Sequence, residues 1–281
     1  MLSDCHMHMV LDGVAWREAI GRHSREPLDS FIRNTLEQYQ RSGYGYLRDG
    51  GDRWGVGRRA RELAADYGIV YRTPLAPLCC RGHYGSFIGQ TYENMRQYAA
   101  LVQKARRDGA DFIKIMISGL MDFDRFGVLS EEGLPPEQIR ELIHIAHEEG
   151  FAVMAHANGA RTVEAAAVFG VDSVEHGAYQ DADSLRAMAE NGCVWVPTAS
   201  TVGNLRGKGR FSEEAVQRIL AHLLENCADF VAMGGLLAPG SDAGAWEVFH
   251  GGTTEYAILS QVPGWEARAD TAIAALRKKF G

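Results

Sequence analysis

The chain has 281 residues, 46% of them hydrophobic, which is enough for two small domains or one large barrel with a sizeable core. The net charge of −7 and the lack of a basic run argue against a nucleic-acid partner. The sequence also shows no signal peptide and no stretch suited to a membrane span, and its five cysteines are an odd number. We therefore expect a cytoplasmic protein that acts on a small-molecule substrate and does not bind a membrane. A homo-oligomer is one assembly compatible with the sequence.

Short apolar runs, rich in branched and aromatic residues, recur along the chain and predict buried parallel strands. They lie at residues 2–5, 44–47, 69–71, 112–117, 151–155, 171–174, 194–196 and 236–238. Amphipathic segments with helical spacing alternate with these runs and end near Gly or Asn. They lie at residues 58–67, 94–107, 135–150, 160–169, 184–190 and 213–233.

This alternation of strands and helices indicates a parallel sheet. Eight strands within this length favour a closed (β/α)8 TIM barrel over an open dinucleotide-binding sheet, and no G-x-G-x-x-G motif follows the first strand. We expect a single barrel domain over residues 1–281.

Functional residues of such barrels lie where the strands end. Five of the predicted strands carry or lead to residues of metal-binding type there: His6, His8, Lys114, His156, His176 and Asp242. Alternation along a strand places His6 and His8 on the same side. Imidazole nitrogens and carboxylate oxygens suit zinc and similar divalent ions.

Each of these residues alone has an ordinary structural explanation. His156 or His176 can be a hydrogen-bonded core histidine, Asp242 can shape a turn, and Lys114 can be a buried lysine paired with a carboxylate. Their joint occurrence at five strand ends favours a shared metal site.

The same residues, in the same order, resemble the amidohydrolase superfamily. The phrases around Lys114, His156, His176 and Asp242 look like the prolidase and imidazolonepropionase-like branch: GADFIKIM, AHANG, VDSVEHG and GSDAG. Members of that branch usually carry a small β-sandwich beside the barrel, and this sequence predicts none.

The resemblance implies two divalent ions, with zinc as the first expectation and manganese, cobalt and iron also compatible. His6, His8 and Asp242 would hold one ion, His156 and His176 the other, and Lys114, as a carbamate formed with CO2, would bridge them. A hydroxide between the ions would attack the substrate, and Asp242 would act as the catalytic proton shuttle.

Three residues in loops after strands are weaker candidates. His83 follows the third strand, where the branch also has a histidine, and we expect it to be a catalytic donor to the oxyanion and a substrate contact. Its neighbour Tyr84 and Arg125 are further candidate substrate contacts. Arg48 and Asp49, after the second strand, are candidates for orienting ligands or substrate, although we favour a structural salt bridge between them.

The resemblance favours hydrolysis of a C–N bond in an amide, a lactam or a dipeptide-like substrate. Ester or lactone hydrolysis at the same site stays open, as does a barrel that binds metal without catalysis. Schiff-base chemistry at Lys114 would leave the histidines unexplained. Deamination is disfavoured because His156 begins the phrase HANG, which lacks the glutamate expected in deaminases.

Overall fold

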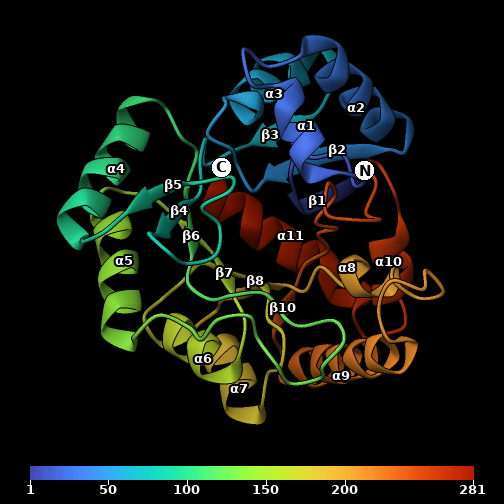
Figure 1. Cartoon of the computed structure of the whole chain (residues 1–281). Coiled ribbons are helices and arrows are strands. Elements are labelled where there is room, and N and C mark those ends of the chain that lie inside the picture. Colours follow the sequence, from blue (N-terminus) through green and yellow to red (C-terminus); the bar gives the residue numbers. More distant parts are fainter.

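The computed structural model describes all of residues 1–281 and is a (β/α)8 barrel of parallel strands (Figure 1). One sheet has the order β1-β2-β3, and the second has the order β10-β9-β8-β7-β6-β4-β5. The strands are β1 (Leu2–Met7), β2 (Tyr44–Asp49), β3 (Val70–Arg72), β4 (Leu78–Cys80), β5 (Gln90–Tyr92), β6 (Ile113–Met116), β7 (Val153–Ala157), β8 (Ser173–His176), β9 (Val194–Val196) and β10 (Leu236–Leu237).

Backbone hydrogen bonds connect the two sheets on both sides. Near β10, the amide of Cys5 donates to the carbonyl of Pro239 at 3.0 Å, and that of His8 donates to Ala243 at 2.8 Å. On the other side, the amide of Asp111 donates to the carbonyl of Thr73 at 3.0 Å. The eight strands predicted from the sequence are therefore all present and surround a common interior.

The third barrel position is more complex than the sequence predicted. β3 pairs with β2 and β4 pairs with β6, so together they fill the place between β2 and β6. Pro74 and Pro77 separate them, because proline has no amide hydrogen for the ladder. β5 then pairs with β4 at the outer edge. The expected strand at residues 69–71 is thus only the first half of this position.

Helices cover the outside of the strands (Figure 1). The six predicted helical segments are confirmed as α3 (Val56–Ala64, followed by a 3-10 turn at Ala65–Tyr67), α4 (Met95–Arg107), α5 (Pro136–Glu148), α6 (Ala160–Val168), α7 (Ala182–Glu190) and α9 (Glu213–Ala232). The sequence did not predict α1 (Trp16–Arg22), α2 (Asp29–Arg41), α8 (Ser200–Gly203) or α10 (Thr254–Leu259), whereas α11 (Glu266–Phe280) agrees with the short helical tail expected after Asp242. No helix has both the length and the apolar character that a bilayer crossing needs.

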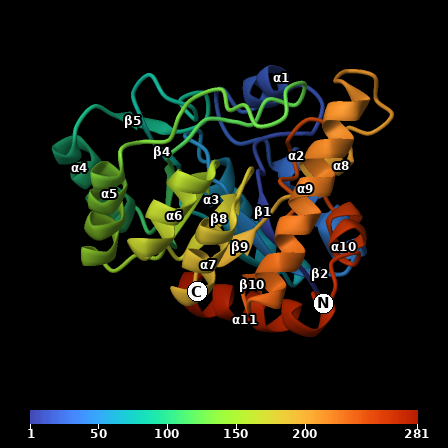
Figure 2. The same ribbon diagram turned by 90° about the horizontal axis from the view of Figure 1, so that it is seen from below.

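The last helix, α11, lies across the N-terminal ends of the strands, opposite the long loops (Figure 2). Its side chains Ala272, Leu276 and Phe280 share one buried cluster with barrel residues such as Phe112 and Met154. This cluster fills one end of the barrel. The C-terminal ends of the strands, at the opposite end of the barrel, surround a cavity instead. All ten strands belong to the two sheets of the barrel.

Candidate active site and metal centre

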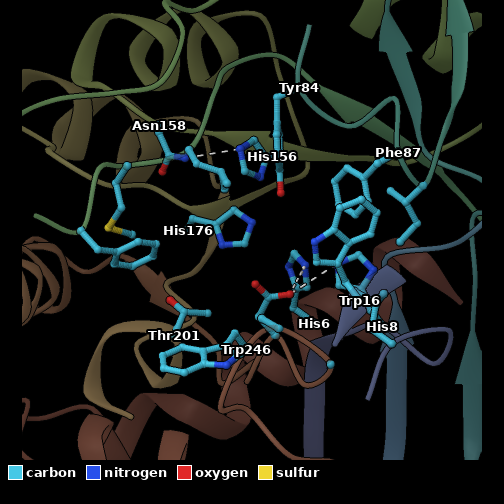
Figure 3. A pocket seen from close by; sticks show the side chains of 18 of the residues that line it. His6, His8, Trp16, Tyr84, Phe87, His156, Asn158, His176, Thr201 and Trp246 are labelled. Carbon is cyan, nitrogen blue, oxygen red and sulfur yellow. Dashed lines mark hydrogen bonds and ion pairs between the residues drawn. The ribbon is translucent and has the colours of Figure 1, made fainter. Parts of the chain in front are cut away.

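A cavity of about 590 Å³ opens among the loops at the C-terminal ends of the strands, and His6, His8, His156 and His176 surround it (Figure 3). Barrel enzymes build their active sites at this end. All six residues that the sequence predicted as metal ligands line the cavity: His6, His8, Lys114, His156, His176 and Asp242. The structure therefore brings the complete predicted ligand set together.

His6, on β1, is fixed by a fully buried chain of polar groups. Its Nδ1 lies 2.7 Å from Oε2 of Glu175, and the other carboxylate oxygen accepts a hydrogen bond from Arg48 at 2.7 Å. Arg48 also donates to the carbonyl of Cys5 and to the hydroxyl of Ser173. The carboxylate holds the proton of His6 on Nδ1, so Nε2 offers its lone pair to the cavity. This corrects the expected Arg48–Asp49 salt bridge: Arg48 pairs with Glu175 instead.

His8 lies one residue beyond β1 and approaches the backbone of the neighbouring strand end. A Cβ atom on Gly50 would lie 2.2 Å from Cε1 of His8, so only glycine leaves room for this ring. Nε2 of His8 lies 3.4 Å from Oδ1 of Asp242, and Nε2 of His6 lies 3.6 Å from the same atom. His6, His8 and Asp242 each offer one ligand atom, and these three atoms lie within 4.8 Å of one another.

The backbone at Asp242 has a φ of 58°, in the left-handed region that non-glycine residues rarely adopt. Its amide donates to the carbonyl of His6 at 2.7 Å, and the preceding Ser241 donates through both its amide and its hydroxyl to the buried Asp4. These bonds hold the turn against its strain. Burial raises the pKa of Asp242 to about 7, although the nearby Lys114 opposes the shift.

Lys114 lies in β6 with its side chain buried in the barrel. Its Nζ has no hydrogen-bond partner, which is costly for a buried ammonium group. Burial lowers the pKa of this amine to about 8. The alternative of a lysine paired directly with a carboxylate is therefore not what the structure shows.

His156 on β7 and His176 at the end of β8 face each other, with ring centroids 4.5 Å apart. Nε2 of His156 lies 3.2 Å from the carbonyl of Gly119, and Nδ1 of His176 lies 2.8 Å from the hydroxyl of Thr198. Burial and Lys114 lower the pKa of His156 to about 3, and burial lowers that of His176 strongly. Both imidazoles are therefore neutral at physiological pH, as metal ligands must be.

The donor set fits divalent metal ions. Three buried atoms at the cavity have no hydrogen-bond partner: Nε2 of His6, Nδ1 of His8 and Nζ of Lys114. Buried polar atoms are almost always satisfied, so such a cluster indicates a ligand that completes it. Nitrogen and carboxylate donors are the types that zinc and related ions prefer.

Of the three candidate substrate contacts, only one lines the cavity. Tyr84 lines the cavity, and its ring lies 4.8 Å from that of His156. His83 and Arg125 do not line it: His83 is 44% exposed and lies beside Glu131, and Arg125 is 70% exposed and pairs with Asp122. Their roles in catalysis and substrate binding stay predictions, and the structure places neither side chain at the site.

Other residues of the site, some lining the cavity and some buried behind it, were not recognised in the sequence. Glu175 immediately precedes His176, so its position beside a ligand was the one available indication of its role. Asn158, directly after β7, donates through its side-chain amide to the carbonyl of Gly119 at 2.9 Å, and the same nitrogen lies 3.4 Å from Nε2 of His156. The apolar mouth comes from segments far apart in the sequence, namely Trp16, Phe87, Phe123, Phe211 and Trp246. No local pattern marks these residues.

Comparison with known proteins agrees with this architecture. Ochratoxinase from Aspergillus niger is 28% identical over 149 residues, which cover 51% of this chain and 28% of that protein, so the match spans less than a third of its length. Its crystal structure superposes with a TM-score of 0.73 at 22% identity, covering 99% of this chain and 69% of that chain. The crystal structure of a Xaa-Pro dipeptidase with bound methionine gives a TM-score of 0.77 at 20% identity, covering 99% and 75%.

These structural likenesses show a shared fold. The profile of the amidohydrolase family matches residues 5–262, which is nearly the whole chain and includes all six candidate ligands. The chain therefore belongs to the amidohydrolase family.

Proposed function

We propose that this protein is a divalent-metal-dependent hydrolase that cleaves a C–N bond in a small amide, lactam or dipeptide-like molecule. The observation that carries the proposal is the group of unpartnered buried nitrogens of His6, His8 and Lys114 around one cavity at the strand ends. Ochratoxinase and Xaa-Pro dipeptidase, whose names denote hydrolases, share this fold and support the choice of reaction class.

The residues that would hold the metal fall into two groups. His6, His8 and Asp242, whose ligand atoms lie close together, would hold one ion. His156 and His176 would hold a second, and zinc is the first candidate for both. Divalent ions at such a site supply Lewis acidity, which acidifies water and polarises a carbonyl group.

Lys114 is suited to carry the bridging carbamate. Its lowered pKa, about 8, leaves part of the amine neutral near physiological pH. The ammonium would first lose one proton, and the neutral Nζ would then form an N–C bond with CO2 and lose a second, so that a buried positive charge is replaced by an anionic group with two oxygens. This change removes the unpaired buried ammonium and provides two ligand atoms.

Asp242 is suited to move the proton during hydrolysis. Its raised pKa, about 7, makes the carboxylate an effective base near neutral pH. In the overall reaction a C–O bond forms from water, the C–N bond breaks, and a proton passes through the Asp242 carboxylate to the departing nitrogen. Glu175 and Thr198 hold the rings of His6 and His176 in place throughout.

Metal content and turnover of one pair of variants test the proposal. Wild-type protein expressed with zinc and bicarbonate should contain about two equivalents of metal per chain and hydrolyse at least one member of an amide, lactam and dipeptide panel. His8→Asn should lose metal and activity together. The matched control is His144→Asn, because His144 is an exposed histidine on α5 and should retain both.

The outcomes separate the alternatives. Turnover confined to esters and lactones would favour the other hydrolase assignment, because the same site can act on either carbonyl. A filled site without turnover of any compound would favour a metal-binding barrel. Wild-type protein that takes up no metal would contradict the proposal.

A further inference from the structure

The outer part of the cavity contains a cation that the candidate metal centre does not use. Arg210 lies on the loop between α8 and α9 and lines the cavity. Its guanidinium carbon lies 4.3 Å from the ring centroid of Trp246 and 5.2 Å from that of Phe211. Stacking on aromatic faces holds a guanidinium in place while its N–H edges stay free to donate.

The same loop has two other cationic side chains, and both have partners. Lys208 pairs with Glu247 at 2.5 Å, and Arg206 donates to the carbonyl of Gly203. Arg210 has no hydrogen bond and no ion pair with any residue of the chain. It is therefore the one cation of this loop that has neither a hydrogen-bond nor an ion-pair partner, and it is the one that lines the cavity.

The loop is anchored rather than loosely attached. The amide of Ser212 donates to Asp124 at 2.8 Å, and the rings of Phe123 and Phe211 lie 5.2 Å apart. Both contacts tie the loop to the segment that follows β6. Arg210 is thus presented in a defined place, which reduces the entropy lost when it binds a ligand.

The rest of the mouth is apolar. Trp16, Phe87, Phe123, Phe211 and Trp246 line it, and Asp242, already assigned to the metal centre, is the only carboxylate in the whole cavity lining. A ligand that fills this space must be largely hydrophobic. A ligand that also satisfies Arg210 must carry an anion, and a carboxylate matches the fork of a guanidinium.

The geometry points to Arg210 as the specificity-determining residue of a carboxylate subsite, so that the preferred substrates are aromatic amides that also carry a free carboxylate. The inference rests on the proposed hydrolase function for its substrate class. The aromatic body lies among the rings of the mouth, the carboxylate meets Arg210, and the scissile amide reaches the metal centre. Trp246 and Phe211 act as the platform that keeps the guanidinium aligned.

Binding without turnover tests the subsite directly. Calorimetric titration of the metal-loaded protein would compare naphthylpropanoate with naphthylpropanol, which has the same ring system but no charge and no amide. Wild type should bind the carboxylate roughly 10- to 100-fold more tightly, the range for hydrogen bonds to charged groups. Arg210→Met should abolish this preference, and Arg210→Lys should restore part of it.

Arg17→Met is the matched control. Arg17 also stacks on a tryptophan of the mouth, at 4.3 Å from the Trp16 centroid, but it does not line the cavity. It should retain the wild-type preference. A preference that survives in Arg210→Met would mean that the carboxylate binds elsewhere, including at the metal, and would overturn the inference, as would equal affinity of the two ligands or binding of neither to wild type.

A second pair of compounds separates this inference from the proposed function. N-naphthoyl-phenylalanine and N-naphthoyl-phenethylamine contain the same amide and differ in the carboxylate alone. Wild type should cleave the first with the higher kcat/KM, and Arg210→Met should bring the two values together. If neither is cleaved but the binding preference for naphthylpropanoate depends on Arg210, the subsite stands and hydrolysis of aromatic amides fails.

Discussion

The floor and the mouth of the cavity hold their charged groups in different ways. At the floor, Arg48, Glu175 and His6 are fully buried and joined by hydrogen bonds of 2.7 Å. At the mouth, Arg210 lies on aromatic rings and has no polar partner in the chain. A buried charge must be paired within the protein because it has lost its hydration, whereas water can solvate a charge at an opening until a ligand binds it. The floor is thus suited to fix catalytic geometry, and the mouth to select what reaches it.

The largest effect should follow from a change at the floor. Glu175→Gln leaves Arg48 as an uncompensated buried cation, so the free energy of unfolding should fall by about 3–5 kcal/mol. It also removes the carboxylate that orients His6, so metal affinity should fall roughly 10- to 100-fold. Chemical denaturation of the metal-free protein and a metal competition titration measure the two effects.

A double variant sharpens this result. Arg48→Met combined with Glu175→Gln should be less destabilised than Glu175→Gln alone, because the stranded charge is gone. Arg125→Gln is the surface control, since it breaks the exposed pair with Asp122 and should leave stability unchanged. Equal loss of stability in Glu175→Gln and Arg125→Gln would remove the distinction between a buried and an exposed pair.

The pH dependence of metal uptake should identify which floor groups carry protons. The pKa values of His8 and His156 are lowered to about 3, so both rings are already neutral above pH ~4. The pKa of Asp242 is raised to about 7 and that of Lys114 is lowered to about 8. Below these values, metal must displace a proton from each group.

Metal affinity should therefore fall as the pH drops from about 8 to 5, by up to about tenfold per unit for each displaced proton. Calorimetry at pH ~6 in buffers with different heats of ionisation counts the protons released. Release of one to about three protons per chain would agree with the assignment: one from Asp242, and two from Lys114, which loses one as the ammonium becomes neutral and a second as the carbamate forms. Uptake that does not change with pH, or release of more protons than these groups hold, would refute the assignment.

The smallest effect should come from the mouth. Phe87 packs against Trp16 and Tyr84 with centroid distances of 5.3 and 5.8 Å. Phe87→Leu removes one aromatic surface, and KM for an aromatic substrate should rise about 2- to 12-fold, the worth of one aromatic contact. The value of kcat should stay unchanged, because no reacting atom is touched. A large fall in kcat would place Phe87 with the catalytic floor instead.

The sequence predicted most of the barrel because its strands are short, buried and apolar. The ligands were also predictable: His6, Lys114, His156 and His176 sit on or at the ends of strands, and a barrel brings those ends together. Helices α1 and α2 were missed between the first two strands. Their apolar residues are interrupted by polar ones, and the cores they contribute to form only on packing against β2 and α3.

The loops could not be predicted in the same way. His83 and Trp246 both follow strands; the sequence indicated His83 as a site residue and did not indicate Trp246, yet only Trp246 lines the cavity. Their placement depends on contacts between distant loops, such as that between Ser212 and Asp124. Arg48 was paired with the wrong partner for a related reason. Its true partner, Glu175, lies 127 residues away in the sequence and across the barrel.

The turn that holds Asp242 has a consequence for the order in which the molecule is made. Ser241 is bonded to Asp4 across 237 residues of sequence, and Asp242 completes the ligand group that His6 and His8 begin. A nascent chain emerging from a ribosome carries its first two histidines long before their third partner exists. Loading of that ion is then a late event in biosynthesis. Until translation has passed residue 242, the first strand keeps an edge of unpaired backbone groups that is exposed to aggregation.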